Sequence, residues 1–507
     1  MPCLPVRRSC AGIAAAMLAA AAFWACPVPA HAAGAQLVVA QSSDVLTLDP
    51  SRDASTIGQN IFVNVFDQLI EIRNDGTVVP KLAASWESSR DATEWTFTLR
   101  TDARFHDGKP VTADDVLFTF RKVMGDVKSS LRSYLTKVKA VEQVGPNRIR
   151  FSLTAPFAPF DRQVALISIL PRQAYEAAGP EKFSVAPIGS GPFKVVRWAK
   201  DSEVRLDANE QYWGGAPKVK TLVFKPVPSE SSRAAALASG ELDVVPALPP
   251  NLVPRMEATS GVKVDKVVSG RTVYLGYNVT NPVLADLKLR QAIDHAIDRG
   301  AIANSLLRGM GKPSGQPVAP STFGYDPAIA PARHDEALAR KLLKESAYKG
   351  EKIVFQYPNN RLASGESVAQ AVAGYLKAIG INVEMQGMEF TAYFPLWTGH
   401  KLAGLYMYGF NPTLMDPDLM LNLMYEKGGH GYMAHPELEQ LIQAQRAEGD
   451  AGKRKAILGR IWRLSAEQVM YSPLYDEVQA YGVRQGLKWS PPRNELMRFH
   501  AAEVGAR

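Results

Sequence analysis

The sequence predicts an α/β protein with more than one domain. The chain has 507 residues, of which 46% are hydrophobic and 21% are charged, an ordinary composition for a folded globular protein. At about 100–200 residues per domain, this length is enough for two to four hydrophobic cores. In the second half, segments with the period of a strand alternate with segments with the period of a helix. That alternation is typical of a mostly parallel sheet covered by helices.

The first half contains a strand, a turn and a helix in succession. In residues 94–100 every second residue is aromatic or leucine, which predicts a half-buried strand. The pair DG at 107–108 predicts a turn. Thr112 and Asp115 have the spacing of a helix N-cap and its box partner, so we expect a helix to begin there.

The second half follows a strand, helix, strand order. Residues 353–357 and 381–385 have strand character, and an apolar helical face between them ends at Gly380. The other predicted elements of this half are a helix at 286–297, a helix at 390–397, a strand at 402–410 and a helix from about 418. We therefore expect a mostly parallel sheet with covering helices over residues 280–475.

Residues 1–32 have the organisation of a cleaved secretory signal. Two arginines precede an alanine-rich apolar stretch, and an AHA site follows it at residues 30–32. The arginine pair leaves general and twin-arginine export both open. The three cysteines, Cys3, Cys10 and Cys26, all lie in this leader, so we expect a mature chain without disulfides or thiolate metal sites. A lipid anchor at Cys26 is not favoured, because FWA precedes it.

The charge of the chain argues against nucleic acid as a partner. The formal net charge is +8 and falls to +6 without the leader, because residues 1–32 contain two arginines and no acidic residue. The excess is spread out, with no run of five or six like charges, as in a solvated surface. After the leader no apolar run approaches the roughly 20 residues that a membrane span needs, so we expect a soluble mature protein.

Four blocks occur in a fixed order along the mature chain. They are LAASW, WTFTLR, FHDGKP and TADDV at 82–86, 95–100, 105–110 and 112–116; PIGSGPF, NEQYWGG and ALASGELD at 187–193, 209–215 and 236–243; LRQAIDHAIDR at 289–299; and DPD at 416–418. Together they resemble the family 5 extracellular solute-binding proteins of bacterial ABC transporters, the dipeptide, oligopeptide and nickel binding group.

This resemblance implies a fold and a division into parts. The fold is α/β, a two-lobed periplasmic binding protein clamshell of class II, cluster C type, with an extra subdomain inserted in lobe I. The implied parts are a signal peptide at 1–32, lobe I core at 33–75, the inserted subdomain at 76–184, a second part of the lobe I core at 185–277, lobe II at 278–477 and a return to lobe I at 478–507. Two strands, near 273–277 and 477–481, would cross between the lobes.

The resemblance also implies a function. It is that of a periplasmic substrate-binding protein that captures a peptide or peptide-like small solute in the cleft and delivers it to inner-membrane ABC permease subunits. We expect a monomer without catalytic residues, metal or cofactor. A ligand sensor or chaperone without transport stays open, and so does the ligand, among peptides, glutathione-like compounds, opines, metal chelates and sugars. A secreted hydrolase is disfavoured, because SAYK at 346–349 ends a predicted helix where a nucleophile needs the start.

In lobe II, candidate ligand contacts follow the predicted strand at 402–410. Tyr408 and Phe410 share one face of this strand and Asn411 follows it, at the carboxyl end where ligands bind in α/β lobes; an ordinary core role for the aromatic residues stays equally open. Thr413 falls where peptide-binding relatives commonly carry the acid that captures the ligand's amine. Asp416 either takes over that role or caps the following helix, and both interpretations stay open.

Further candidates lie on other segments that should border the cleft. Tyr357 and Arg361 lie around the end of the strand at 353–357, and Arg361 has the fork-shaped donors that suit a ligand carboxylate, unless it is simply solvated. The remaining candidates are Tyr277 and Asn278, at the crossing strand, and Arg52 and Ser55, in the lobe I loop at 49–55. Metal ligation by histidines such as His106 is not favoured, because the surrounding residues have turn chemistry.

Overall fold

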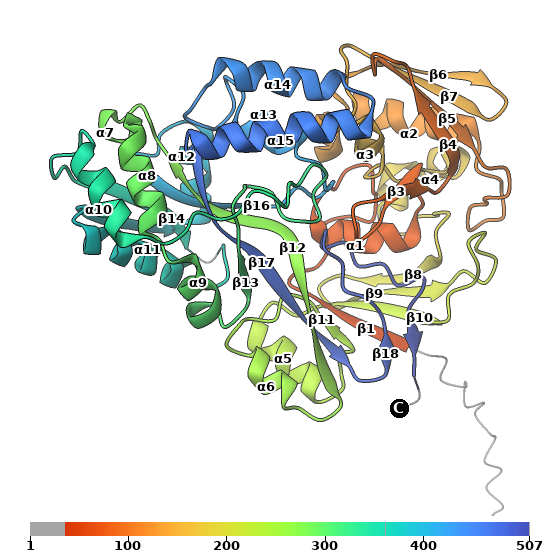
Figure 1. Ribbon diagram of the computed structural model, residues 1–507. Coiled ribbons are helices and arrows are strands. Elements are labelled where there is room, and N and C mark those ends of the chain that lie inside the picture. The colour runs from red at the N-terminus through yellow and green to blue at the C-terminus, as the bar shows by residue number, and fades with distance from the viewer. Residues whose placement is uncertain (1–35, 360, 506–507) are drawn as a thin grey trace, which may run out of the picture. The chain divides into compact units, whose positions relative to one another are not determined.

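The computed structural model describes residues 36–359 and 361–505; the predicted leader and its three cysteines lie outside them. Within these residues, the main element is an 11-stranded sheet with the order β15-β14-β16-β12-β17-β11-β1-β10-β9-β8, and β13 pairs with β17 beside this path (Figure 1). Its strands are β1 (Gln36–Gln41), β8 (Phe193–Ala199), β9 (Glu203–Ala208), β10 (Thr221–Pro226), β11 (Val244–Val245), β12 (Val262–Tyr277), β13 (Gly311–Pro313), β14 (Ile353–Asn359), β15 (Val383–Glu389), β16 (Leu405–Phe410) and β17 (Tyr471–Arg484).

Strands β12 and β17 join the two halves of this sheet. They pair antiparallel from Val262 opposite Arg484 to Gly276 opposite Tyr471, and they lie side by side through the middle of Figure 1. Strand β11 adds to one end of β17, and β16 adds to the other end of β12. We call the part built on β1 and β8–β11 lobe I and the part built on β14–β16 lobe II. Both segments predicted to cross between the lobes lie within this strand pair.

Lobe I packs helices around the strands next to β1. They are α1 (Thr56–Val65), α4 (Arg172–Phe183), α5 (Glu230–Ala238) and α6 (Val253–Glu257), and the short pair β18 (Leu487–Lys488) and β19 (Glu503–Val504) lies near the end of the chain. Helix α1 begins where Ser55 Oγ accepts a hydrogen bond from the Gly58 amide at 3.1 Å. Its apolar residues Ile61 and Val65 are buried against the sheet, because a spacing of four residues places them on one face of the helix.

The inserted subdomain has its own antiparallel sheet, in the order β4-β5-β7-β6. Its elements are β4 (Ala83–Ser88), β5 (Glu94–Leu99), α2 (Ala113–Gly125), the 3-10 turn η1 (Ser130–Leu135), β6 (Val138–Gly145), β7 (Arg148–Leu153) and α3 (Phe160–Val164), and the hairpin β2 (Ile70–Ile72) and β3 (Val78–Pro80) precedes them. The predicted strand at 94–100 and the predicted helix start are confirmed. Asp115 accepts hydrogen bonds from the Thr112 amide at 2.9 Å and from the Thr112 hydroxyl at 2.7 Å.

Lobe II contains the predicted strand, helix, strand unit. Strand β14 pairs parallel with both β15 and β16, and α11 (Gly365–Ile379) connects β14 to β15. Gly380 ends α11 at φ 102°, a backbone angle that glycine adopts without strain. The other helices of this lobe are α7 (Pro282–Ala285), α8 (Leu287–Ala296), α9 (Arg299–Ala301), the π-helical turn η2 (Ile302–Leu306), α10 (Glu336–Glu345), α12 (Phe390–Thr398), α13 (Asp418–Met424), α14 (Pro436–Ala447) and α15 (Ala451–Glu467).

Two predicted strand starts in lobe II were too early. Strand β15 begins at Val383 and not at residue 381, and β16 begins at Leu405 and not at residue 402. At the second position the backbone is held by a side chain and not by a neighbouring strand, because the Leu402 carbonyl accepts a hydrogen bond from the Asn278 amide group at 2.6 Å. None of the described helices combines the length and the apolar character that crossing a bilayer would require.

A carboxyl group without an ion-pair partner among the described residues is buried between the crossing strands. Asp476 on β17 is 1% exposed and accepts a hydrogen bond from the Thr272 hydroxyl on β12 at 2.7 Å. Burial raises the pKa of Asp476 to about 7, and the hydrogen bonds from Thr272 and Ser314 and the charge of Lys312 oppose this shift.

We therefore expect Asp476→Asn to stabilise the protein above neutral pH. Between pH 4 and 7 the native state keeps this proton and the unfolded state loses it, so the stability of the wild type should fall by roughly 1.4 kcal/mol per pH unit relative to the variant. Urea unfolding of both proteins from pH 4 to 8 measures the difference. Asp201→Asn, at an exposed position, is the matched control, and parallel curves for wild type and Asp476→Asn would contradict the assignment.

Candidate functional site

A cavity lies where the crossing strands meet both lobes. It has a volume of about 710 Å³ and is open to solvent. Its lining combines a lobe I loop, the crossing strands, a lobe II loop that follows β14, and one residue near the end of the chain. The lining residues are Glu230, Ala247, Leu248, Pro249, Pro250, Asn251, Arg271, Leu307, Met310, Arg361, Leu362, Ala363, Ser364, Tyr475, Glu477, Val478, Gln479, Ala480 and Glu495.

A cluster of charged and amide side chains occupies one wall of this cavity. Arg271 on β12 donates from Nε to Glu477 at 3.2 Å and from a terminal nitrogen to Glu495 at 3.3 Å. The same oxygen of Glu495 accepts hydrogen bonds from the amide groups of Asn411 and Gln479, each at 2.9 Å. The cluster therefore ties together both crossing strands, the end of β16 and the last segment of the chain.

The backbone around Arg271 explains why the cluster forms there. The pairing of β12 with β17 shifts register between Val268 and Thr272, and such an irregularity re-aims the side chains of the strand. A Cβ atom on Gly270 would lie 2.4 Å from Asn411 Oδ1, and one on Gly409 would lie 3.4 Å from Arg271 Cδ and 2.7 Å from Leu362. Glycine at both positions leaves the room that Arg271 and Asn411 occupy.

Arg361 is the other cation of the cavity lining, and unlike Arg271 it is not paired with a carboxylate of the described residues. It makes no hydrogen bond or ion pair with any described residue, and its guanidinium lies 5.3 Å from the ring centre of Phe390. Burial and then the charge of Arg271 lower the pKa of Arg361. An arginine in such a place is a ready partner for a carboxylate.

Of the residues predicted as ligand contacts, the structure brings three to this region. Arg361 lines the cavity, Asn411 holds Glu495, which also lines it, and Tyr408 lies close enough to Arg361 to act on its charge. The ring of Tyr408 is nevertheless used in the core, because it stacks on Trp397 with ring centres 4.4 Å apart. Phe410 is partly buried against the same core cluster.

The predicted contacts of the crossing strand and of β14 are core residues. Tyr277 is 1% exposed, and its hydroxyl is hydrogen-bonded to Ser472 at 2.6 Å. Asn278 uses its side chain within lobe II, where it also accepts from the Thr280 hydroxyl. Tyr357 is 6% exposed and packs within the main core cluster. The polar groups of Tyr277 and Asn278 and the ring of Tyr357 are thus occupied by contacts within the protein.

The two predicted lobe I residues also have local partners. Arg52 donates from Nε to Asp126 at 3.1 Å, which connects the loop at 49–55 to the end of α2. Ser55 is exposed and caps α1. Neither residue lines the cavity.

Asp416, in the loop before α13, forms a buried ion pair with Arg454 of α15. Its two carboxylate oxygens accept hydrogen bonds from Arg454 at 2.7 and 2.8 Å, and its side chain is 4% exposed. Asp416 also accepts from the Asp418 amide at the start of α13, which fits the capping interpretation. Burial alone would raise the pKa of Asp416, but the Arg454 guanidinium outweighs it and lowers the pKa. Thr413, three residues earlier, is half-buried and lies outside the cavity lining.

Motif inspection missed four residues of the cluster. Arg271, Glu477, Gln479 and Glu495 belong to none of the four sequence blocks and come from three separate segments. One signal was available, because Glu477 and Gln479 lie two residues apart on a predicted crossing strand, and residues at that spacing share a face. Nothing in the sequence connects them to Arg271 or Glu495.

The histidine of the FHDGKP block has a structural role. His106 Nδ1 accepts a hydrogen bond from the Gly189 amide at 3.1 Å, and Nε2 lies 3.1 Å from the Gly191 carbonyl. Burial lowers the pKa of His106 to about 4, so the ring is neutral at physiological pH. Over the described part of the chain, no three histidine, cysteine or carboxylate side chains are grouped to hold a metal ion.

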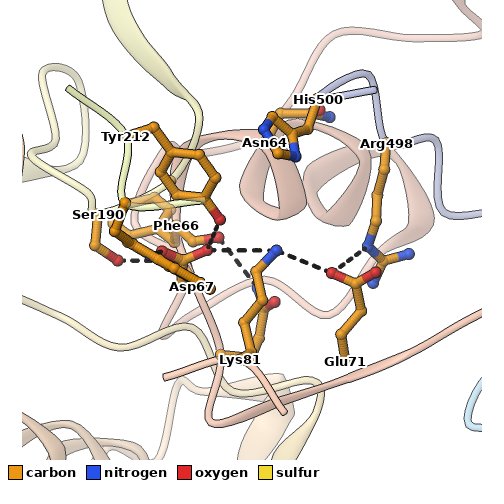
Figure 2. Close-up of polar contacts among 12 residues, drawn as sticks. Asn64, Phe66, Asp67, Glu71, Lys81, Ser190, Tyr212, Arg498 and His500 are labelled. Carbon is orange, nitrogen blue, oxygen red and sulfur yellow. Dashed lines mark hydrogen bonds and ion pairs between the residues drawn. The ribbon is translucent and has the colours of Figure 1, made fainter. Parts of the chain in front are cut away.

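A second charged cluster lies in lobe I (Figure 2). Buried Asp67 accepts a hydrogen bond from the Tyr212 hydroxyl at 2.9 Å, and Lys81 lies 3.6 Å from Asp67 and 2.9 Å from Glu71. Arg498 extends the chain of charges at 3.7 Å from Glu71. Each charge has an opposite charge beside it. The cluster thus anchors the NEQYWGG block and the chain end to the β2–β3 hairpin.

Comparisons with known proteins point to one family. Residues 77–432 match the model for bacterial extracellular solute-binding proteins, family 5 Middle. The chain is 29% identical over 483 residues to the dipeptide-binding protein of Escherichia coli K12, covering 87% of this chain and 88% of that protein.

Solved structures with the same fold agree with that match. The structure of HbpA2 from Haemophilus parasuis is similar with a TM-score of 0.85 at 23% identity, covering 93% of this chain and 100% of that one. DppA from Helicobacter pylori in complex with peptide STSA is similar with a TM-score of 0.74 at 24% identity, covering 93% of this chain and 98% of that one. The predicted two-lobed α/β fold is thus confirmed.

We expect Asp416→Asn to cost about 3–5 kcal/mol of stability, because it removes the carboxylate charge that pairs with the buried guanidinium groups of Arg454 and Arg162. The control is Glu437→Gln, which removes an ion pair to Arg460 whose two side chains are 50% and 60% exposed and should cost less than about 1 kcal/mol. Urea unfolding at pH 7 compares the two. Equal, small losses of unfolding free energy for both variants would show that the buried ion pair contributes little to stability.

Proposed function

Because the chain belongs to family 5 of the bacterial extracellular solute-binding proteins, we propose that it captures a peptide or peptide-like small solute in the cavity between its lobes. It would then deliver this solute to an inner-membrane ABC permease. The dipeptide-binding relative from Escherichia coli and the peptide complex of the Helicobacter pylori protein support this ligand class.

The observation that carries the proposal is the charge pattern of the cavity. Arg271, Arg361, Glu477 and Glu495 all line it, and each of these two glutamates has one carboxylate oxygen that accepts no hydrogen bond from a described residue. A zwitterionic ligand matches this pattern. Its carboxylate would meet Arg361, and its ammonium would meet Glu477 and Glu495 in place of the acid that relatives carry at the position of Thr413. Without such partners, a buried ammonium would be costly.

Transport follows from closure of the two lobes over the ligand. Arg361 to Ser364 belong to lobe II, whereas Leu248 to Asn251 belong to lobe I, so a ligand in the cavity can contact both. A ligand that binds the closed form better shifts the population toward it, and a shift from 1:99 to 99:1 needs about 5.5 kcal/mol of differential binding. A micromolar ligand supplies about 8 kcal/mol in total, so closure requires that most of this free energy comes from contacts made only in the closed form.

The proposed location is the periplasm. Residues 1–32 would serve as the export signal, and the closed protein would present its lobes to the permease. Pull-down with the cognate permease, in the presence and absence of ligand, tests this part of the proposal. Transport predicts a preference for the closed, liganded form.

The first test is titration calorimetry of the protein without its leader, with the dipeptide Ala-Phe and its C-terminal amide. We expect Arg361→Ala to weaken Ala-Phe by about 10- to 100-fold, the value of a charge-assisted hydrogen bond, and to change the amide little. Arg460→Ala, at a side chain that is 60% exposed, is the control. An unchanged affinity of Arg361→Ala for Ala-Phe would remove Arg361 from the site.

A further inference from the structure

Of the two arginines of the cavity, Arg271 is paired with carboxylates of the described residues and Arg361 is not. Arg271 has a side chain that is 10% exposed and is paired with two carboxylates, Glu477 and Glu495. Arg361 is paired with none of the described residues, and its guanidinium lies 5.3 Å from the ring centre of Phe390. This asymmetry needs a reason, because both glutamates also attract Arg361.

The reason is that Arg271 is paired with the two glutamates and that its positive charge also acts on Arg361. Burial opposes the charge of Arg271, but Glu477 and then Glu495 outweigh it and raise the pKa of this arginine. The positive charge of Arg271 repels that of Arg361 and lowers the pKa of Arg361. As long as Arg271 holds both carboxylates, Arg361 has little to gain by approaching them.

The backbone fixes Arg271 in this role. Its neighbour Gly270 donates its amide to the Arg493 carbonyl at 2.9 Å, which ties the irregular part of β12 to the chain segment that carries Glu495. Gln479 and Asn411 donate to the same oxygen of Glu495 that Arg271 contacts, so this carboxylate is held from three sides. Arg361, by contrast, follows the end of β14 in a loop and can change its conformation more easily.

We infer that Arg271 is a positioning residue that sets the charge preference of the cavity: by occupying Glu477 and Glu495, it keeps Arg361 unpaired and available to an anionic group of the ligand. The inference rests on the proposed function and deepens it. Without Arg271, Arg361 is the one cation left in the described lining, and the two carboxylates would draw it out of the ligand's reach.

The test separates the two ends of a dipeptide with single-charge probes. N-acetyl-Ala-Phe carries only the carboxylate, and Ala-Phe amide carries only the ammonium. In Arg271→Met we expect N-acetyl-Ala-Phe to bind about tenfold or more weakly, and Ala-Phe amide to bind as well as before or better. Arg271→Lys keeps the charge and should restore part of the affinity for N-acetyl-Ala-Phe. Arg463→Met is the control, because it removes one positive charge at a side chain that is 52% exposed and paired with Asp326.

A second pair of substitutions changes the charge in the opposite direction. Glu477→Gln combined with Glu495→Gln keeps the size of both side chains and frees both arginines. This double variant should bind N-acetyl-Ala-Phe more tightly and Ala-Phe amide more weakly. It also keeps the inference testable if Arg271→Met does not fold.

A readout without ligand distinguishes this inference from the proposed function. Phenylglyoxal modifies accessible arginines, and peptide mass spectrometry gives the rate at Arg361. We expect slower modification of Arg361 in Arg271→Met than in the wild type, because the glutamates then hold it. If the wild type binds no peptide probe, the proposed function fails while this rate still tests the position of Arg361. An unchanged rate, or an unchanged ratio of the two probe affinities in Arg271→Met, would overturn the inference.

Discussion

The antiparallel ladder of β12 and β17 is the constraint on which the rest of the structure depends. It joins two parts of one sheet, so each lobe is covalently continuous with the other through both strands. In a regular ladder the side chains would alternate strictly between the two faces of the sheet, and the connection between the lobes would be stiff. The register shift between Val268 and Thr272 breaks that regularity at the level of the cavity. This irregularity, together with a second register shift between Val273 and Tyr274, places Arg271 at the wall of the site and marks where the connection between the lobes is least regular.

The local elements of this fold could be predicted because their causes are local. The helix start at Thr112 depends on a carboxylate three residues away, and the end of α11 depends on one glycine. The parallel pairing of β14 with β15 followed from the intervening helix. Strand starts were less accurate, because an element begins where a neighbour supplies hydrogen bonds, and at Leu402 that neighbour is a side chain more than a hundred residues away in sequence.

The candidate site could be predicted only in part, for the same physical reason. Arg361 was found because it follows a strand end, and position after a strand is a local property. Arg271 and Glu495 are 224 residues apart, and their pairing depends on the tertiary fold alone. Tyr408 shows an ambiguity of pattern reasoning, since a face of aromatic residues on a strand is equally suited to a ligand and to a core. Its ring stacks on that of Trp397, a contact that no local pattern in the sequence indicates.

The hydrogen bonds from the inserted subdomain to the loop before α13 and to α14 add a second condition on closure. Arg162 of the inserted subdomain donates to the Leu414 carbonyl at 3.2 Å and to the Met415 carbonyl at 3.3 Å, and the Ala158 amide donates to the Arg446 carbonyl at 2.7 Å. These contacts join the inserted subdomain to lobe II at a place distant in sequence from the crossing strands. Separating these contacts would leave a buried guanidinium and buried carbonyl groups without partners, and this costs more free energy than bending an irregular ladder. If the lobes close over a ligand as we propose, a motion that turns about both this junction and the crossing strands would break the fewest buried contacts, and the loop of Arg361 would then move against the wall formed by Arg271 and its glutamates.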